Sequence, residues 1–205
     1  MYLRRFYFII LVYVNLKMEY DTKDKTFWKR KGNDMKVLLG AVNAKYIHSN
    51  LAVYCLKAYA EKYGDTSDEI SIGEYTINQQ LDEILRDIYK RKPDMLCLSC
   101  YIWNLTYVEE ICREIKKVMP QIIIWIGGEV SYDGVKVLER LPEVDGVMKG
   151  EGEQTFCDLL HFYQDKTVDG LQNMKGIVYR EQTGQIVENE WRKTMDLSKV
   201  PFVYE

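Results

Sequence analysis

Two glycine-rich segments, each directly after an apolar run, are the places where this chain is best suited to hold a ligand. Gly127-Gly128 follows the run at residues 122–126, and the segment at residues 150–155 (GEGEQT) follows a shorter run at 144–148. Glycine lets the backbone turn sharply and approach a bound molecule. Such runs are typical of strands in a parallel sheet, whose carboxyl edge is where ligands bind. Ordinary strand-to-helix turns are the alternative explanation.

Other patterns that could carry chemistry are incomplete. Cys97 and Cys100 have C-x-x-C spacing, but residues three apart on a strand point to opposite faces, and no second pair completes a zinc site. We expect Cys97 to lie in the core and Cys100 to border the crevice in which such a sheet binds its ligand. For His48, a hydrogen-bonding role is favoured over a ligand role. The fingerprints of dinucleotide-binding and phosphate-binding loops are missing. Asn43 and Ser99 stand where a phosphate-receiving regulator needs acids.

Composition excludes several classes of function. The 205 residues are 47% hydrophobic and 29% charged, which is ordinary for a globular protein. A net charge of -3 gives no electrostatic footprint for nucleic acid, and none is expected as a partner. Five cysteines, an odd number, argue against a disulfide framework and predict a reducing, cytoplasmic location.

The first 34 residues do not match the rest of the chain. Arg4-Arg5 precede an apolar run at residues 6–16, which is shorter than the roughly 20 residues that a membrane-spanning helix needs. No small-residue cleavage site follows, as a signal peptide would require. We expect residues 1–34 to be upstream read-through that the fold does not need, with the domain starting at Met35 and no stable membrane insertion. A short membrane anchor is the alternative.

Strand-like and helix-like segments alternate from Met35 onward. Strands are predicted at residues 37–42, 69–75, 95–100, 122–126 and 144–148. The alternation predicts an α/β fold, a flavodoxin-like open parallel sheet of five strands in the order 2-1-3-4-5 with helices on both faces. The crevice of this topology lies between the first and third strands. The first helix is expected to be capped by Ser49 or Asn50 and to bury Leu51, Cys55, Ala58 and Tyr59.

Beyond the fifth helix the pattern changes. Residues 176–181 and 185–190, joined through Thr183-Gly184, predict a β-hairpin, and residues 196–202 resemble a linker. The predicted division of the chain is therefore a leader at 1–34, a ligand-binding domain at 35–165, and a hairpin with linker at 166–205.

Four loop segments together carry a family resemblance. They are residues 43–51 (NAKYIHSNL), 99–104 (SCYIWN), 127–131 (GGEVS) and 150–155 (GEGEQT). With these segments and the tail at 196–204, residues 35–205 resemble the amino-terminal cobalamin-binding domain of cobalamin-dependent radical-SAM enzymes. The resemblance implies cobalamin as the cofactor, no protein ligand to a metal, and the binding residues Asn43, Ala44, Lys45, Tyr46, His48, Ser49, Asn50, Ser99, Cys100, Tyr101, Trp103, Gly127, Gly128, Glu129, Gly150, Glu151, Gly152 and Thr155.

Two positions depart from relatives in this group. Cobalamin domains that ligate cobalt carry D-x-H-x-x-G after the first strand, and that alignment puts Asn43 at the aspartate, Lys45 at the histidine and His48 at the glycine. This resembles the histidine-free variety, so the cofactor is expected base-off with its nucleotide tail inserted and no histidine ligand. The proline of the related Gly-Gly-Pro-Glu-Val-Ser loop is also missing after Gly128. Tyr101 and Trp103 are equally suited to contact the corrin edge or to cover the core.

The resemblance implies a cofactor-binding module of a B12-dependent radical-SAM enzyme, with methyltransferases among the candidates. The chain contains no C-x-x-x-C-x-x-C cluster loop, so S-adenosylmethionine and a 4Fe-4S cluster are expected only in an absent downstream domain. That radical-SAM domain, in cis, is the expected partner, and this segment alone is not expected to turn over a substrate. The substrate, a small molecule or a macromolecule, is not identified by these residues. The alternative is a stand-alone flavodoxin-like ligand-binding or regulatory module.

Overall fold

The computed structural model describes residues 34–45, 49–64, 67–164 and 170–203. Residues 1–33 of the predicted leader, and Tyr46 and His48 of the first loop, lie outside this part of the chain. Among the residues described, no helix combines the length and apolarity needed to cross a membrane.

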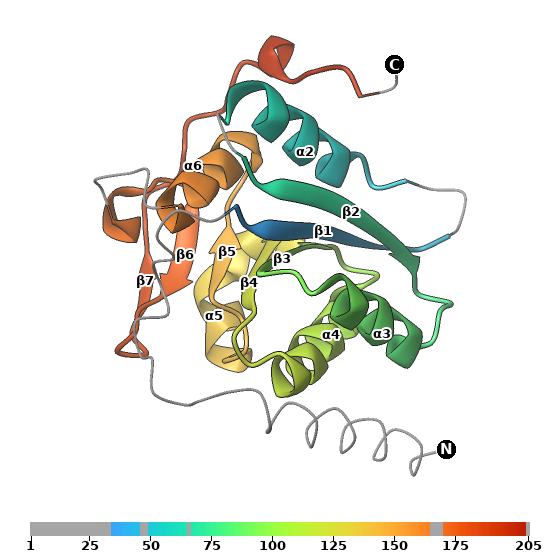
Figure 1. Cartoon of the computed structure of the whole chain (residues 1–205). Coiled ribbons are helices and arrows are strands. Elements are labelled where there is room, and N and C mark those ends of the chain that lie inside the picture. The colour runs from blue at the N-terminus through green and yellow to red at the C-terminus, as the bar shows by residue number, and fades with distance from the viewer. Residues whose placement is uncertain (1–33, 46–48, 65–66, 165–169, 204–205) are drawn as a thin grey trace.

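A twisted seven-stranded sheet runs through the molecule (Figure 1). Its first five strands are parallel and lie in the order β2-β1-β3-β4-β5, which confirms the predicted order and the predicted edge position of β2. Apolar runs buried on both faces explain why the central strands form. The strands are β1 (Lys36–Asn43), β2 (Glu69–Thr76), β3 (Met95–Cys100), β4 (Ile123–Gly128), β5 (Gly146–Met148), β6 (Ile177–Arg180) and β7 (Ile186–Glu188).

The C-terminal hairpin corrects the predicted count of five strands. It forms as expected, with Gly184 at φ 88° in its turn, but it is part of the sheet rather than an appendage beyond it. β6 pairs antiparallel with β5, and β7 pairs with β6. Without β6, the three residues of β5 would be a sheet edge with unpaired N–H and C=O groups. The hairpin therefore completes the same domain that carries the parallel strands.

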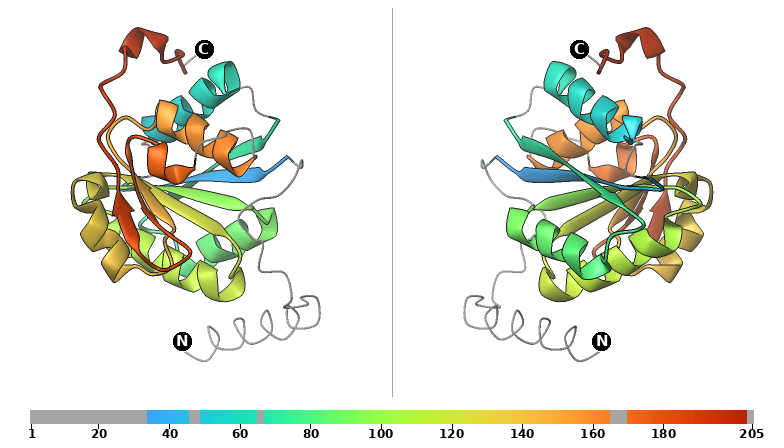
Figure 2. Two further views of the ribbon diagram at one scale, coloured as in Figure 1. Left: turned by 90° about the vertical axis from the view of Figure 1, so that its left-hand side faces the viewer. Right: turned by 90° about the vertical axis from the view of Figure 1, so that its right-hand side faces the viewer.

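Helices cover both faces of the sheet (Figure 2). One face carries α2 and α6, and the other carries α3, α4 and α5, as the two separate hydrophobic clusters also show. Short 3-10 segments lie in the loops that follow β4, α6 and β7. The helices are α2 (Leu51–Tyr63), α3 (Leu81–Arg91), α4 (Leu105–Val118), α5 (Gly134–Arg140) and α6 (Glu153–Tyr163), and the 3-10 segments are η1 (Glu129–Asp133), η2 (Leu171–Asn173) and η3 (Leu197–Lys199).

Alternation along the central strands divides the core in two. On β3, Cys97 points to the α2 and α6 face, while Leu98 and Cys100 join the cluster under α3, α4 and α5. On the first of these faces Trp125 is completely buried, and its indole N–H donates to the Tyr163 hydroxyl at 3.1 Å. Residues at odd positions of β3 therefore face α2 and α6.

The buried face of α2 differs from the prediction. Tyr59 is buried as expected, but the other fully buried residues are Val53 and Ala60, and Leu51 is exposed. Apolar residues occur on several sides of this helix, so their spacing did not single out one face. Packing against α6 and the sheet selected the face that carries Val53 and Ala60.

Candidate functional site

A cavity of about 170 Å³ opens at the carboxyl ends of β3, β4 and β5. It lies on the face covered by α2 and α6, because α2 and the first residue of α6 supply part of its wall. Glycines and short side chains form most of the rest. The lining residues are Ala52, Val53, Leu56, Cys97, Leu98, Ser99, Tyr101, Gly127, Gly128, Met148, Gly150, Glu151, Gly152 and Glu153.

The cavity is displaced from the predicted crevice between β1 and β3. Asn104 bridges the ends of those two strands, since its amide donates to the carbonyls of Val42 at 2.9 Å and Ser99 at 3.1 Å. Its carbonyl oxygen accepts from the Tyr101 N–H at 2.7 Å, and the side chain is buried. A fully paired amide closes this gap, so the open space lies one strand further along, over β3 to β5.

Gly128 adopts a backbone conformation that side chains disfavour. Its φ is 96° and its ψ is -138°, and an added Cβ would lie 2.4 Å from the carbonyl oxygen of Cys100. The strands therefore approach closely because this residue lacks a side chain. Glu129, which follows Gly128 directly where the related loop has an intervening proline, is the first residue of the 3-10 segment η1. The positive φ confirms the sharp turn expected at this position.

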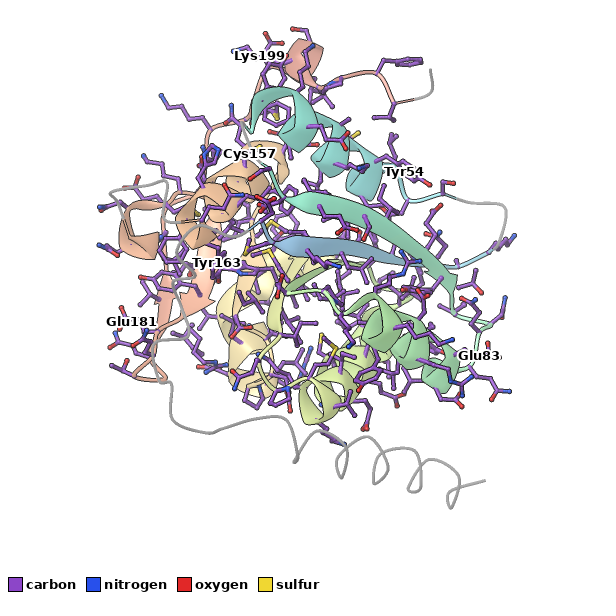
Figure 3. The ribbon with its side chains drawn as sticks, in the orientation of Figure 1. Tyr54, Glu83, Cys157, Tyr163, Glu181 and Lys199 are labelled. Carbon is purple, nitrogen blue, oxygen red and sulfur yellow. The ribbon has the colours of Figure 1, made fainter. Side chains whose placement is uncertain are left out.

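Glu74 on β2 anchors the loop that leads from β1 into α2. Its carboxylate accepts from the Asn43 side chain at 3.0 Å, the Asn50 N–H at 3.1 Å and the Tyr54 hydroxyl at 2.7 Å. Tyr54 projects from the first turn of α2 toward the edge of the sheet (Figure 3). Since α2 has no acidic residue in its first turn and no side-chain cap, a carboxylate from the neighbouring strand takes both roles.

The cap expected from Ser49 or Asn50 is therefore corrected. Asn50 occupies the N-cap position, but its side-chain amide donates to the Ser99 hydroxyl at 3.1 Å instead of capping the helix. Ser49 donates to Glu74 at 3.5 Å. A chain of contacts thus runs from Glu74 through Asn50 to Ser99, which lines the cavity.

Replacing Glu74 with glutamine is expected to destabilise the fold by about 1 kcal/mol at pH 7, a modest value because Glu74 is exposed. Burial raises the pKa of Glu74, but hydrogen bonds from Tyr54, Asn50 and its other donors outweigh it and hold the pKa below 4.5. A carboxyl group whose pKa is lower in the folded than in the unfolded protein stabilises the fold at pH values above its unfolded-state pKa. The difference between parent and variant should therefore shrink as pH falls below about 4.5. Urea unfolding at several pH values measures it.

Glu69→Gln is the matched control for that experiment. Glu69 lies on the same strand and pairs with Lys36 at 3.7 Å, with both side chains well exposed. Exposed pairs of this kind contribute little. An equal effect of both substitutions on stability would contradict the anchoring role of Glu74.

Seven of the predicted site residues line the cavity. They are Ser99, Tyr101, Gly127, Gly128, Gly150, Glu151 and Gly152. The prediction missed the residues of α2 at positions 52, 53 and 56, and also Cys97, Leu98, Met148 and Glu153. In the sequence, the glycines among the seven predicted lining residues are recognisable because they follow predicted strands. Nothing in the helical pattern marks which residues of α2 face the cavity.

The remaining predicted residues lie elsewhere. Cys100 is completely buried on the opposite face, so Cys97 takes the place at the cavity that was expected for Cys100. Thr155 is buried and accepts from Arg192 at 3.2 Å. Tyr46 and His48 are outside the described residues. The others do not line the cavity: Asn43 ends β1, Glu129 begins η1, and the remaining residues are Ala44, Lys45, Ser49, Asn50 and Trp103.

Exposed aromatic side chains surround the mouth of the cavity. Trp103 stacks on Tyr101, a lining residue, with ring centroids 4.6 Å apart and planes within 3°. Trp191 lies beside the lining residue Gly150 and 5.8 Å from the ring of Tyr132. Single exposed aromatic residues are ordinary, but several around one opening mark a surface for an apolar ligand or partner.

The C-terminal segment is tied to the Gly150 loop. Lys149 is buried, its ammonium lies 4.7 Å from the centroid of the Trp191 ring, and it donates to Glu188 at 2.8 Å. Glu151 accepts from the Met195 N–H at 2.9 Å. The segment that follows β7 therefore helps to shape one wall of the site.

Three buried cysteines, Cys97, Cys100 and Cys157, are unsuited to nucleophilic chemistry at neutral pH. Burial raises the pKa of the Cys97 thiol, and it raises the pKa of Cys100 and Cys157 to about 12. Thiols that keep their protons are poor nucleophiles. The described residues contain no group of three or more His, Cys, Asp or Glu placed to hold a metal ion. The site can therefore bind a ligand through shape, backbone groups and a few polar side chains.

Comparison with the sequences of known proteins finds relatives that match parts of this chain. The cobalamin-dependent radical SAM methyltransferase TokK of Streptomyces tokunonensis is 36% identical over 70 residues, which cover 34% of this chain and 10% of TokK. The anaerobic magnesium-protoporphyrin IX monomethyl ester cyclase of Rubrivivax gelatinosus is 26% identical over 128 residues, covering 62% of this chain and 23% of the cyclase. This chain therefore corresponds to a small part of the length of either relative.

Solved structures share the fold. The cobalamin-dependent S-adenosylmethionine radical enzyme OxsB, with aqua-cobalamin and S-adenosylmethionine bound, aligns with a TM-score of 0.69 at 20% identity, covering 82% of this chain and 24% of that chain. The radical S-adenosylmethionine methyltransferase TsrM from Kitasatospora setae aligns with a TM-score of 0.61 at 17% identity, covering 77% and 30%. The family model described as the B12 binding domain matches residues 37–160, more than half of the chain. The chain therefore belongs to the B12-binding domain family.

Proposed function

We propose that this chain binds cobalamin at the cavity formed by the ends of β3, β4 and β5. The observation that carries the proposal is the position of this cavity, which lies within the region matched by the B12-binding family and on the carboxyl edge of its parallel strands. Ligands of open α/β sheets bind at this edge.

The residues present fit part of such a cofactor. A cavity of about 170 Å³ is smaller than the roughly 300–1,000 Å³ of a pocket that encloses a whole ligand, so it suits one narrow arm. Gly127, Gly128 and Ser99 keep that space open. Asn50 does not line the cavity but donates to Ser99, which does, and its own side-chain oxygen is buried with no partner among the described residues. A flat ring system would remain outside, against the aromatic rim that includes Trp103.

The mode of binding that we propose is base-off, with the nucleotide tail inserted and without a histidine ligand to cobalt. Lys45 stands where related domains carry the ligating histidine, and its side chain is exposed. When bound, the cofactor would supply the methyl group that a cobalamin-dependent methyltransferase transfers. The residues described here would bind and orient it.

Cob(II)alamin bound to this chain is expected to give an electron paramagnetic resonance spectrum without nitrogen superhyperfine splitting, because neither the displaced base nor a histidine would ligate cobalt. Free cob(II)alamin, with its base coordinated, is the reference. Splitting that disappears in His48→Ala would contradict the histidine-free mode. Splitting that persists in both proteins would contradict insertion of the tail, and no spectral change in a titration with hydroxocobalamin would contradict cobalamin binding.

We also propose that the natural protein joins this domain to a radical-SAM domain in cis. Support comes from the relatives, of which this chain covers only 10% to 30%. S-adenosylmethionine and a 4Fe-4S cluster would then be bound by that domain. A reading frame that continues from Glu205 into a C-x-x-x-C-x-x-C segment is the expected observation, and an uninterrupted gene that ends at this domain would contradict it.

A further inference from the structure

A glutamate with one unpartnered carboxyl oxygen lines the cavity. Glu153 is the first residue of α6, and its Oε2 atom is buried without a hydrogen-bond partner among the residues that the structure describes. The other glutamate of the same loop differs, because Glu151 is engaged by the Met195 N–H at 2.9 Å. The two glutamates of the Gly150-Glu151-Gly152-Glu153 segment therefore have different surroundings.

The position of Glu153 is unfavourable for the fold alone. A negative charge in the first turn suits the helix dipole, but an exposed glutamate would provide this without burial. Burial raises the pKa of Glu153, a hydrogen bond from its own backbone N–H opposes this rise, and the charge of Glu151 adds to it. Cys55 on α2 and Cys157 on α6 also lie within its electrostatic reach, and neither provides a positive charge. Buried polar atoms without partners are uncommon in native proteins, and one that lines a cavity is placed to meet a bound water or ligand.

We propose that Glu153 determines specificity for the nucleotide arm of cobalamin by accepting a hydrogen bond from that arm inside the cavity. This inference rests on the proposed function. The nucleotide arm carries hydroxyl groups on its ribose and an amide N–H in its linker, and both can donate to a carboxyl oxygen. Its phosphate is anionic and would be repelled by a carboxylate, so the ribose or the amide is the group that Glu153 meets.

The experiment compares cobalamin with cobinamide, which retains the corrin ring but lacks the nucleotide arm. Glu153→Met keeps a similar length and a high helix propensity but removes the acceptor. Its affinity for cobalamin is expected to fall at least tenfold, while its affinity for cobinamide stays at the parent value. Glu153→Gln retains an acceptor oxygen and should recover most of the lost affinity.

Glu83→Met is the matched control. Glu83 also lies in the first turn of a helix, α3, where it is exposed and does not line the cavity; Figure 3 shows it on the other side of the sheet from α2. This variant should bind both ligands like the parent. The thermal unfolding midpoint of Glu153→Met should equal or exceed that of the parent, because a buried carboxyl oxygen without a partner is removed.

Several outcomes would overturn the inference. Unchanged cobalamin affinity in Glu153→Met, or equal weakening for cobalamin and cobinamide, would show that Glu153 does not contact the arm. A large fall in the unfolding midpoint of both Glu153 variants would assign Glu153 to the fold. If the parent binds neither ligand, the proposed function fails, and this inference fails with it. A parent that binds cobalamin and an unaffected Glu153→Met would refute this inference alone.

Discussion

Replacing Ser99 with leucine is expected to lower the affinity for cobalamin more than a hundredfold while the domain remains folded. Ser99 lies at an odd position of β3, so its side chain points to the α2 and α6 face and lines the cavity. Leucine would fill space that the ligand needs. A steric penalty of about 3 kcal/mol, typical of overpacking, corresponds to a loss of more than a hundredfold. Spectroscopic titration with hydroxocobalamin and thermal unfolding of the same preparation measure both quantities.

Ser99→Ala separates blocking from the loss of a hydrogen bond. Alanine removes the contact with the Asn50 amide, which measures 3.1 Å in the parent, but leaves the cavity open. Its cobalamin affinity should stay within about tenfold of the parent, because one hydrogen bond contributes roughly 1 kcal/mol. Parent-like binding by a folded Ser99→Leu protein would place the ligand somewhere other than this cavity.

Gly128→Ala is expected to destabilise the domain by roughly 3 kcal/mol, the sum of a strained backbone and a steric clash. The φ of 96° is one that side chains disfavour, and the new Cβ would lie 2.4 Å from the carbonyl oxygen of Cys100. The clash is with backbone, so it is relieved only if β3 and β4 move apart at the site. Urea unfolding at 25 °C measures the change in the free energy of unfolding.

Gly184→Ala is the control that isolates the backbone contribution. Gly184 has a similar φ of 88° in the turn between β6 and β7, and an added Cβ there meets no atom within 4 Å. This variant should lose only about 1 kcal/mol. If the two substitutions cost the same, the close approach of Gly128 to Cys100 does not constrain the fold.

The sequence by itself determined the arrangement of the parallel strands and much of the cavity floor. Apolar runs alternate with helical periodicity, and right-handed crossovers leave few ways to connect them, so the order β2-β1-β3-β4-β5 follows from local patterns. Glycine after a strand is also a local signal. It pointed to Gly127, Gly128, Gly150 and Gly152, all of which line the cavity.

Tertiary structure alone decided the features that depend on residues far apart in the chain. Glu74 serves the start of α2 from 24 positions away, and Asn104 reaches Val42 across 62 positions to close the gap between β1 and β3. The same holds for the pairing of β6 with β5 and for the face of α2 that carries Val53. The periodicity of a segment indicates which side of a helix or strand is apolar, but it does not predict which polar group from a distant part of the chain will contact that element. For Glu153 the sequence shows a glutamate in a first helical turn, and only packing shows that one oxygen of its carboxyl group is buried at the cavity without a partner among the described residues.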